Sequence, residues 1–251
     1  MGVSEIGRTT APEPPDRVAF TRRTRRRFLV WGSASTVICL ALCAVAARYP
    51  EVLDRWDQVV TLGPDRWRAG AAWLERPLVG VSFAFGLVAS AIATAVVAGL
   101  LVTRKQNRAA AYVVVVMAGT SIVNSLLKQY VGLPRPGVAD PILQYTSNAM
   151  PSGHASNIAA AATAASVLSA LFVRRRERRR LVRLVAVVVA LGVGLDRLLL
   201  GVHTLTEVVA GYALGVGVGL LAAYVVQPAW VSTGRVRGSR ASATDAPEVQ
   251  G

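Results

Sequence analysis

The chain has 251 residues, 53% of them hydrophobic, and its mean hydropathy is +0.45. This composition excludes an ordinary soluble domain, because apolar runs of about 20 residues are typical of membrane spans. The net charge of +14 suits nucleic acid by its sign, but the arginines lie in short runs between apolar stretches, which is typical of a membrane topology signal.

Six apolar stretches are long enough to cross a membrane, and lipid requires each to be a helix that pairs its own backbone groups. We therefore predict an all-α fold, a six-transmembrane-helix bundle that forms one domain over residues 28–227. A basic disordered tail (1–27) and a second disordered tail (228–251) flank it, both cytoplasmic. The stretches cover residues 28–47, 78–102, 109–127, 155–173, 181–200 and 205–226.

The first stretch follows an arginine cluster and ends in "AVAA", so it also resembles a secretory signal peptide. Its length favours an uncleaved span. Cys39 and Cys43 lie within it, four residues apart, and we interpret them as small buried apolar residues.

Most of the arginines lie on one side of the membrane if the six helices alternate. Runs such as "RRTRRR" (22–27) and "RRRERRR" (174–180) define this side, which the positive-inside rule makes cytoplasmic. We expect a multi-pass protein of the plasma membrane. On the outer side, residues 48–77 carry Trp56, Trp67 and Trp73 among balanced charges. Such a loop is typical of an interfacial segment that either admits a lipid from the side or only anchors the protein.

The first polar segment of interest is "LKQYVGLPRP" (127–136), at the outer end of the third span. Pro134 and Pro136 restrict the backbone on both sides of Arg135. Arg135, with Lys128 nearby, could therefore hold a phosphate group. The alternative is that both cations extend to lipid headgroups.

The second segment is "NAMPSGHASN" (148–157), at the start of the fourth span. Ser152 is a suitable N-cap, Gly153 lets an anion approach the backbone, and a helix N-terminus attracts anions. His154 would stand beside that anion and could donate a proton to a leaving oxygen. The alternative is a helix cap whose histidine has no chemical role.

The third segment is "LDRLLLGVHTLTEVVAG" (195–211), which contains Arg197, His203 and Glu207. His203 and Glu207 are four residues apart and share a helix face. Glu207 could then accept a hydrogen bond from one ring nitrogen of His203 and make the other nitrogen more nucleophilic. The alternative is an interfacial His–Glu pair without chemistry.

The predicted topology brings these segments to one membrane surface, because the third and fifth spans end where the fourth and sixth begin. The pattern Lys-x6-Arg-Pro, Pro-Ser-Gly-His and Arg-x5-His, in this order, resembles the signature of the type 2 phosphatidic acid phosphatase superfamily. That superfamily includes lipid phosphate phosphatases and, more distantly, vanadium haloperoxidases and bacterial acid phosphatases.

The resemblance implies a role for each matching residue. His203 would attack phosphorus and form a phosphohistidine, and His154 would protonate the leaving group. Neither a metal nor another cofactor is implied. The phosphate oxygens would be held by Lys128, Arg135, Ser152, Gly153 and Arg197. Two positions depart from the usual pattern, which has Ser where Asp196 stands and Asp where Glu207 stands. A carboxylate at residue 196 would repel phosphate unless it points away or pairs with Arg197.

The resemblance further implies a metal-independent enzyme that hydrolyses a lipid phosphate or diphosphate monoester at the outer membrane–water interface. Polyprenyl diphosphate, phosphatidylglycerol phosphate and phosphatidic acid are the expected substrate classes. We expect membrane lipids but no nucleic acid as partners, and the oligomeric state stays open. The alternatives are a lipid phosphotransferase and a non-catalytic protein that binds or transports lipid phosphates.

Overall fold

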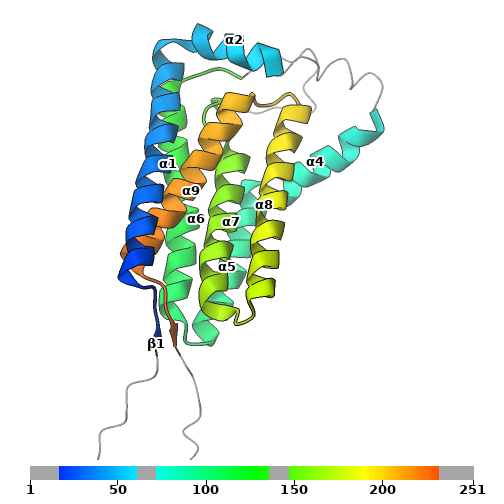
Figure 1. Ribbon diagram of the computed structural model, residues 1–251. Coiled ribbons are helices and arrows are strands. Elements are labelled where there is room, and N and C mark those ends of the chain that lie inside the picture. The colour runs from blue at the N-terminus through cyan, green and yellow to red at the C-terminus, as the bar shows by residue number, and fades with distance from the viewer. Residues whose placement is uncertain (1–16, 61–71, 136–146, 232–251) are drawn as a thin grey trace, which may run out of the picture.

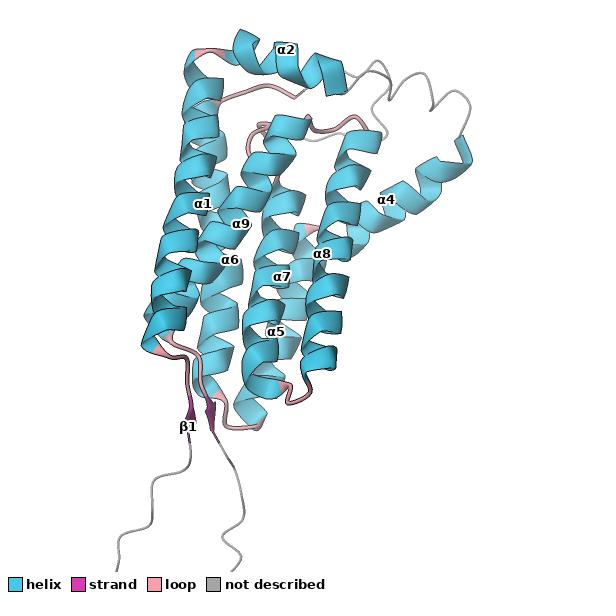
Figure 2. Ribbon diagram, viewed as in Figure 1, coloured by secondary structure: helices cyan, strands magenta, loops and turns pink. Residues whose placement is uncertain are grey.

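The computed structural model describes residues 17–60, 72–135 and 147–231. Within these residues the chain forms an upright bundle of helices, with one short helix across an end of it (Figures 1 and 2). The elements in chain order are β1 Arg17–Val18, α1 Arg22–Arg48, α2 Pro50–Val60, η1 Ala72–Leu74, α4 Glu75–Ala84, α5 Leu87–Thr103, α6 Asn107–Val131, α7 Gly153–Phe172, α8 Arg176–Leu199, α9 Leu205–Val226 and β2 Trp230–Val231.

The described N- and C-terminal ends lie together. β1 and β2 pair antiparallel, with Arg17 opposite Val231, at the end of the bundle farthest from α2 (Figure 1). α1 begins at Arg22, where the Thr21 side chain accepts a hydrogen bond from the backbone N–H of Thr24 at 3.3 Å. The basic tail expected through residue 27 therefore ends earlier than predicted, because this cap and the good helix propensity of arginine extend the helix.

In the described part of the chain, four helices are long and apolar enough to cross a membrane, namely α1, α6, α7 and α9, and the pair α4 and α5 counts as a fifth if it is one span. The expected stretch at 181–200 lies in α8, which is also long. Beyond its arginine-rich start, however, α8 still carries Arg183, Asp196 and Arg197. These charges set α8 apart from the helices whose composition alone indicates a span.

The second predicted span, 78–102, is broken. α4 ends at Ala84, α5 begins at Leu87, and the two helix axes differ by 44°. The prediction of one continuous helix over this stretch is therefore wrong. The break falls at Phe85 and Gly86, and glycine is a poor helix former because it is so flexible when unfolded.

α7 and α9 pack very closely because small residues face each other. A Cβ atom on Gly215 would lie 2.2 Å from the carbonyl oxygen of Ser156, and one on Gly211 would lie 2.6 Å from that of Ser152. Neither contact is sterically tolerable, so glycine is required at both positions. The first glycine of "GVGVG" (215–219) therefore serves helix packing.

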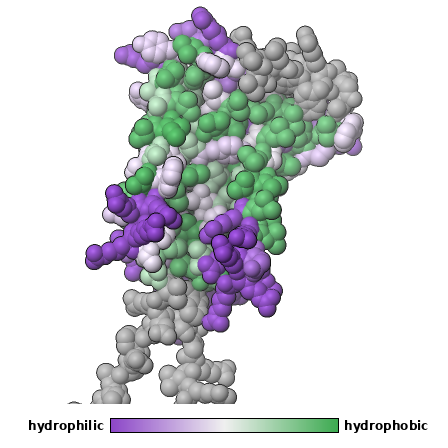
Figure 3. Space-filling view, viewed as in Figure 1, coloured by the Kyte–Doolittle hydropathy of each residue, from purple (hydrophilic) through white to green (hydrophobic). Residues whose placement is uncertain are grey.

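The sides of the bundle are apolar, and hydrophilic residues concentrate toward its two ends (Figure 3). Large apolar side chains point outward along the helices, among them Trp31 on α1, Ile92 on α5, Ile122 on α6 and Leu191 on α8. Such a contiguous apolar surface suits lipid. Cys39 and Cys43 are buried and free, which confirms their interpretation as small buried residues.

Candidate active site

A polar cavity of about 290 Å³ lies between α5, α6 and α7, near the end of the bundle that carries α2. Five of the residues that the sequence singled out line it, and several further polar residues complete the wall. The lining residues are Phe85, Leu87, Ser121, Asn124, Ser125, Lys128, Arg135, Ser147, Gly153, His154, Asn157 and His203.

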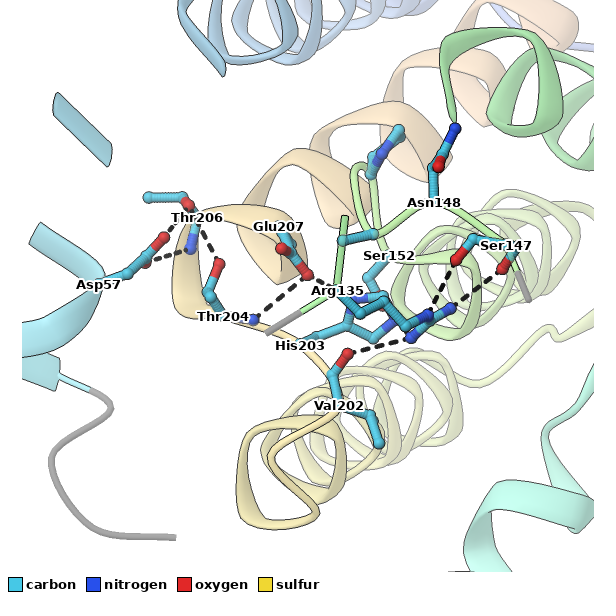
Figure 4. A network of polar contacts seen from close by, with 12 residues as sticks. Asp57, Arg135, Ser147, Asn148, Ser152, Val202, His203, Thr204, Thr206 and Glu207 are labelled. Carbon is cyan, nitrogen blue, oxygen red and sulfur yellow. Dashed lines mark hydrogen bonds and ion pairs between the residues drawn. The ribbon is translucent and has the colours of Figure 1, made fainter. Parts of the chain in front are cut away.

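His203 lies in the turn between α8 and α9, and its side chain is buried. Its Nδ1 lies 2.5 Å from Oε2 of Glu207, and Arg135 donates a hydrogen bond from Nη1 to its Nε2 at 3.2 Å (Figure 4). A guanidinium only donates, so Nε2 is the acceptor. The ring hydrogen therefore sits on Nδ1 and points at the carboxylate, and the lone pair of Nε2 is the nucleophilic one.

The electrostatic surroundings keep His203 neutral. Burial, together with the positive charges of Arg135, Lys128 and Arg197, lowers the pKa of His203 well below its ordinary value. A neutral imidazole retains the lone pair that a nucleophile needs.

Glu207 is held by the start of α9. Its Oε2 accepts the backbone N–H of Thr204 at 3.3 Å, and this forms a capping box in which the Thr204 side chain also takes part. The same carboxylate thus caps the helix and orients His203.

Arg135 is fixed by three protein oxygens besides its contact with His203. Its Nε and Nη2 donate to the carbonyl and hydroxyl oxygens of Ser147, and Nη1 also donates to the carbonyl of Val202 at 3.0 Å (Figure 4). The sequence predicts that Pro134 and Pro136 restrict the backbone around Arg135. Pro136 lies outside the described part of the chain.

Lys128 bridges the end of α6 and the segment before α7. Its Nζ donates to the carbonyl oxygens of Asn148 and Ala149, and the Asn148 amide donates back to the Lys128 carbonyl at 2.9 Å. Its ammonium group also lines the cavity. A phosphate group there would meet a positive charge that is already positioned.

Of the three residues predicted at the start of α7, two line the cavity and the third does not. Gly153 and His154 line the cavity, and His154 donates from Nε2 to the carbonyl oxygen of Ser82 at 3.0 Å. Ser152 is the N-cap residue, but its buried hydroxyl has no hydrogen-bond partner among the described residues. Its backbone N–H donates to the Glu207 carbonyl at 3.0 Å, so Ser152 joins α7 to α9 behind the cavity.

Arg197 is fully buried and does not belong to the lining residues. Its guanidinium bonds the Asp196 carboxylate beside it and the Ser82 hydroxyl. The unusual carboxylate at residue 196 thus pairs with Arg197, one of the two arrangements that would limit its repulsion of phosphate.

Several site residues were not predicted. Ser121 and Asn124 lie on the same face of α6 as the predicted Lys128, at spacings of three and four, a pattern that could have been read from the sequence. Asn124 donates to the Pro151 carbonyl at 3.2 Å and to the Ser156 hydroxyl at 2.9 Å, and so ties α6 to the start of α7.

Asp57 was not predicted either, because it lies among many charged residues in the stretch 48–77. Asp57 lies on α2 and is only 5% exposed, whereas its neighbour Trp56 is 71% exposed. Asp57 accepts hydrogen bonds from the backbone N–H and the hydroxyl of Thr206 (Figure 4). It therefore attaches α2 to the start of α9, next to Glu207.

An apolar groove of about 310 Å³ adjoins the polar cavity. It runs between α5, α6 and α7 and shares Phe85 and Asn157 with the cavity. Its other lining residues are mainly alanine, valine, methionine, isoleucine and leucine, such as Ala93, Val97 and Met117.

The fold and this site define a class: a helical membrane protein with two histidines, a lysine and an arginine around a polar cavity at one end of the bundle. Residues 109–230, a little under half of the chain, match the PAP2 superfamily. This match confirms the resemblance inferred from the three motifs.

Two relatives illustrate the similarity. The chain is 34% identical over 98 residues to phosphatidylglycerophosphatase B of Bacillus subtilis (strain 168), an alignment that covers 38% of this chain and 46% of the relative. The chain thus spans about half the length of that curated relative. It also shares its fold with the crystal structure of a transmembrane PAP2 type phosphatidylglycerolphosphate phosphatase from Bacillus subtilis. That similarity has a TM-score of 0.64 at 23% identity and covers 76% of this chain and 93% of the other.

Proposed function

We propose that the protein is a membrane-embedded phosphatase that hydrolyses a lipid phosphate or diphosphate monoester through a phosphohistidine intermediate. One observation carries this proposal: a polar cavity with two histidines and two cations adjoins an apolar groove at Phe85 and Asn157. A phosphate head in the cavity and its hydrocarbon chain in the groove would each meet a suitable surface.

In the first step, Nε2 of His203 attacks phosphorus and the bond from phosphorus to the ester oxygen breaks. A doubly protonated His154 gives one proton to the departing oxygen, which leaves as an alcohol or a phosphate. Glu207 accepts the Nδ1 hydrogen bond throughout and stabilises the positive charge that develops on the ring.

In the second step, a water molecule attacks the phosphohistidine. His154 accepts a proton from that water, the bond from phosphorus to Nε2 breaks, and inorganic phosphate leaves. Both histidines then regain their starting protonation states, so the cycle closes without a further reactant.

Lys128 and Arg135 would stabilise the charge on the phosphoryl oxygens, with the backbone at Gly153. Arg135 is bonded to Nε2 of His203 without substrate, so a bound phosphate would draw its N–H groups to the phosphoryl oxygens and expose the nucleophile. Fixed cations can supply the stabilisation that a metal ion supplies elsewhere, and we therefore propose metal-independent catalysis.

For the substrate we propose phosphatidylglycerol phosphate first, since both relatives are named as phosphatases of that lipid. Polyprenyl diphosphate and phosphatidic acid remain the other two classes to test. We also propose that α8 is the sixth span and that the cavity faces the outside of the plasma membrane, with both chain ends in the cytoplasm.

The experiment is phosphate release from these three lipids by detergent-purified protein with EDTA present, comparing wild type with His203→Ala. Release that survives EDTA and disappears in the variant supports a metal-independent histidine phosphatase. Phosphate recovered on an added alcohol instead of in solution would favour the phosphotransferase. Tight binding of a lipid phosphate without release, unaffected by the loss of His203, would favour a binding or transport protein.

The orientation can be tested with single cysteines on opposite ends of the bundle, in a variant without Cys39 and Cys43. A membrane-impermeant maleimide added to intact cells should label Trp56→Cys on α2 and leave Arg178→Cys on α8 unlabelled. The reverse pattern would place the cavity on the cytoplasmic side.

A further inference from the structure

Ser82 on α4 forms hydrogen bonds with both His154 and Arg197. Its carbonyl oxygen accepts from Nε2 of His154 at 3.0 Å, and its hydroxyl accepts from Nη2 of Arg197. The same hydroxyl donates to the Leu78 carbonyl one turn earlier at 3.2 Å. Ser82 is 5% exposed, so the polar groups of this residue serve partners inside the protein.

The break between α4 and α5 explains why this carbonyl is available. In a continuous helix, Ser82 would accept the backbone N–H of residue 86. Here the N–H of Gly86 bonds the Phe83 carbonyl at 3.3 Å instead. A Cβ atom on Gly86 would lie 3.1 Å from the Ser82 oxygen, so glycine leaves room for the carbonyl to turn toward His154.

We propose that Ser82 is a positioning residue for the phosphatase reaction, and that the break in this span is part of the active site. The Ser82 carbonyl orients His154, and the Ser82 hydroxyl fixes Arg197 beside both histidines. This inference rests on the proposed function. It adds a residue from outside the segment 109–230 that matches the superfamily.

The contact has a chemical consequence for His154. A carbonyl oxygen carries no hydrogen, so Nε2 of His154 is the protonated nitrogen in this contact. A doubly protonated His154 then gives its Nδ1 proton to the leaving oxygen, regains a proton at Nδ1 from water, and keeps the Nε2 hydrogen on the Ser82 carbonyl throughout. A ring held at one nitrogen can present the other in a constant direction, which proton transfer requires.

The hydroxyl also complements Asp196. The Asp196 carboxylate neutralises Arg197 from one side, and the Ser82 oxygen accepts an N–H from the guanidinium without adding charge. Arg197 is thereby held in a buried position where an unpaired guanidinium would be costly.

The hydroxyl is tested with Ser82→Ala, which removes the acceptor of Arg197 but keeps the backbone carbonyl. Losing a hydrogen bond to a charged group should lower kcat/KM about tenfold and weaken orthovanadate inhibition by a similar factor. Ser82→Thr retains a hydroxyl and should restore both kcat/KM and the inhibition by orthovanadate. The matched control is Ser169→Ala on α7, which removes a buried hydroxyl that bonds its own helix at the Ser166 carbonyl.

The carbonyl is tested with Gly86→Ala, because the added methyl group crowds the Ser82 oxygen. The control is Gly80→Ala in α4, where a Cβ atom would meet no neighbour within 4 Å. Misplaced His154 should slow hydrolysis of an alkyl phosphate at least tenfold. It should slow hydrolysis of a nitrophenyl phosphate with an alkyl tail much less, since that leaving group needs little protonation.

Equal losses on both substrates, or none on either, would overturn the role of the carbonyl. An active wild type with an equally active Ser82→Ala variant would overturn the role of the hydroxyl and leave the proposed function standing. If the wild type releases no phosphate, the proposed function fails, and the stabilisation of melting by orthovanadate still tests Ser82. Equal stabilisation of wild type and Ser82→Ala would then overturn the inference.

Discussion

Nη1 of Arg135 donates a hydrogen bond to Nε2 of His203 across 3.2 Å, which joins two residues that are 68 positions apart in the chain. The contact shows which nitrogen of His203 carries the lone pair, and it covers that lone pair with a donor. A phosphate that attracts the guanidinium would therefore release the nucleophile at the moment of binding.

Replacing Arg135 by lysine should test this coupling. Lysine keeps the positive charge but lacks the planar fork that contacts Ser147, Val202 and His203 together. We expect kcat/KM to fall about 100-fold, a loss comparable with removing one fixed donor to a transition-state anion. Steady-state kinetics on the preferred lipid would measure it. Arg108→Lys, at the other end of the bundle where Arg108 donates to the Val226 carbonyl, is the control and should match wild type.

Glu207→Gln removes the negative charge of the Glu207 side chain while almost preserving its shape. The amide is nearly isosteric but cannot stabilise a positively charged His203, so kcat should fall at least 100-fold with a smaller change in KM. Glu207→Asp keeps the charge and should retain more activity than Glu207→Gln. If the amide variant proved the more active of the two, the orienting role of the carboxylate would be wrong.

Asp196→Ser should have opposite effects on binding and stability. Removing the carboxylate takes away a negative charge near the cavity and frees the Arg197 guanidinium for phosphate, so orthovanadate should inhibit several-fold more strongly. The same change leaves a buried guanidinium with fewer partners, so the melting temperature should drop. Inhibition that is unchanged or weaker would contradict the view that Asp196 competes with the phosphate for Arg197.

The lowered pKa of His203 predicts a specific response to acid. Below the ordinary pKa of histidine, about 6.5, an unfolded chain gains a proton on this residue that the folded protein does not gain. The contribution of His203 to stability is therefore complete above that pH and is lost as the pH falls further. Between pH 7 and 5 the melting temperature of wild type should decrease more than that of His203→Gln. Parallel decreases in the two proteins would contradict the lowered pKa.

Asp57→Ala should loosen α2 from the start of α9. The side chain accepts two hydrogen bonds from Thr206 and acts as a cap contributed by another helix. The loss should lower the free energy of unfolding by about 1 kcal/mol, as for other helix caps. Asp54→Ala, which changes an exposed carboxylate in the same helix, should leave it unchanged. Thermal melts of the two variants would make the comparison.

The sequence alone was sufficient for the helical class, for five of the six regions predicted as long helices and for the common location of Lys128, Arg135, His154 and His203. Apolar runs of about 20 residues and short connections leave few other arrangements in lipid, and consecutive helix ends must meet at one surface. The glycines of 215–219 were also predictable as packing residues, since close helix approach in lipid depends on small side chains.

Only the tertiary structure decided what each polar side chain contacts. The break at Phe85 and Gly86 lies in a run whose composition is still that of a continuous span, and it brings Ser82 to His154, 72 residues away. Asp57 reaches Thr206 across 149 residues, and Arg197 turns to Asp196 and Ser82 instead of lining the cavity. Hydropathy reports where a helix lies in lipid, but hydrogen bonds of a few ångströms depend on how the helices pack, which no local pattern encodes.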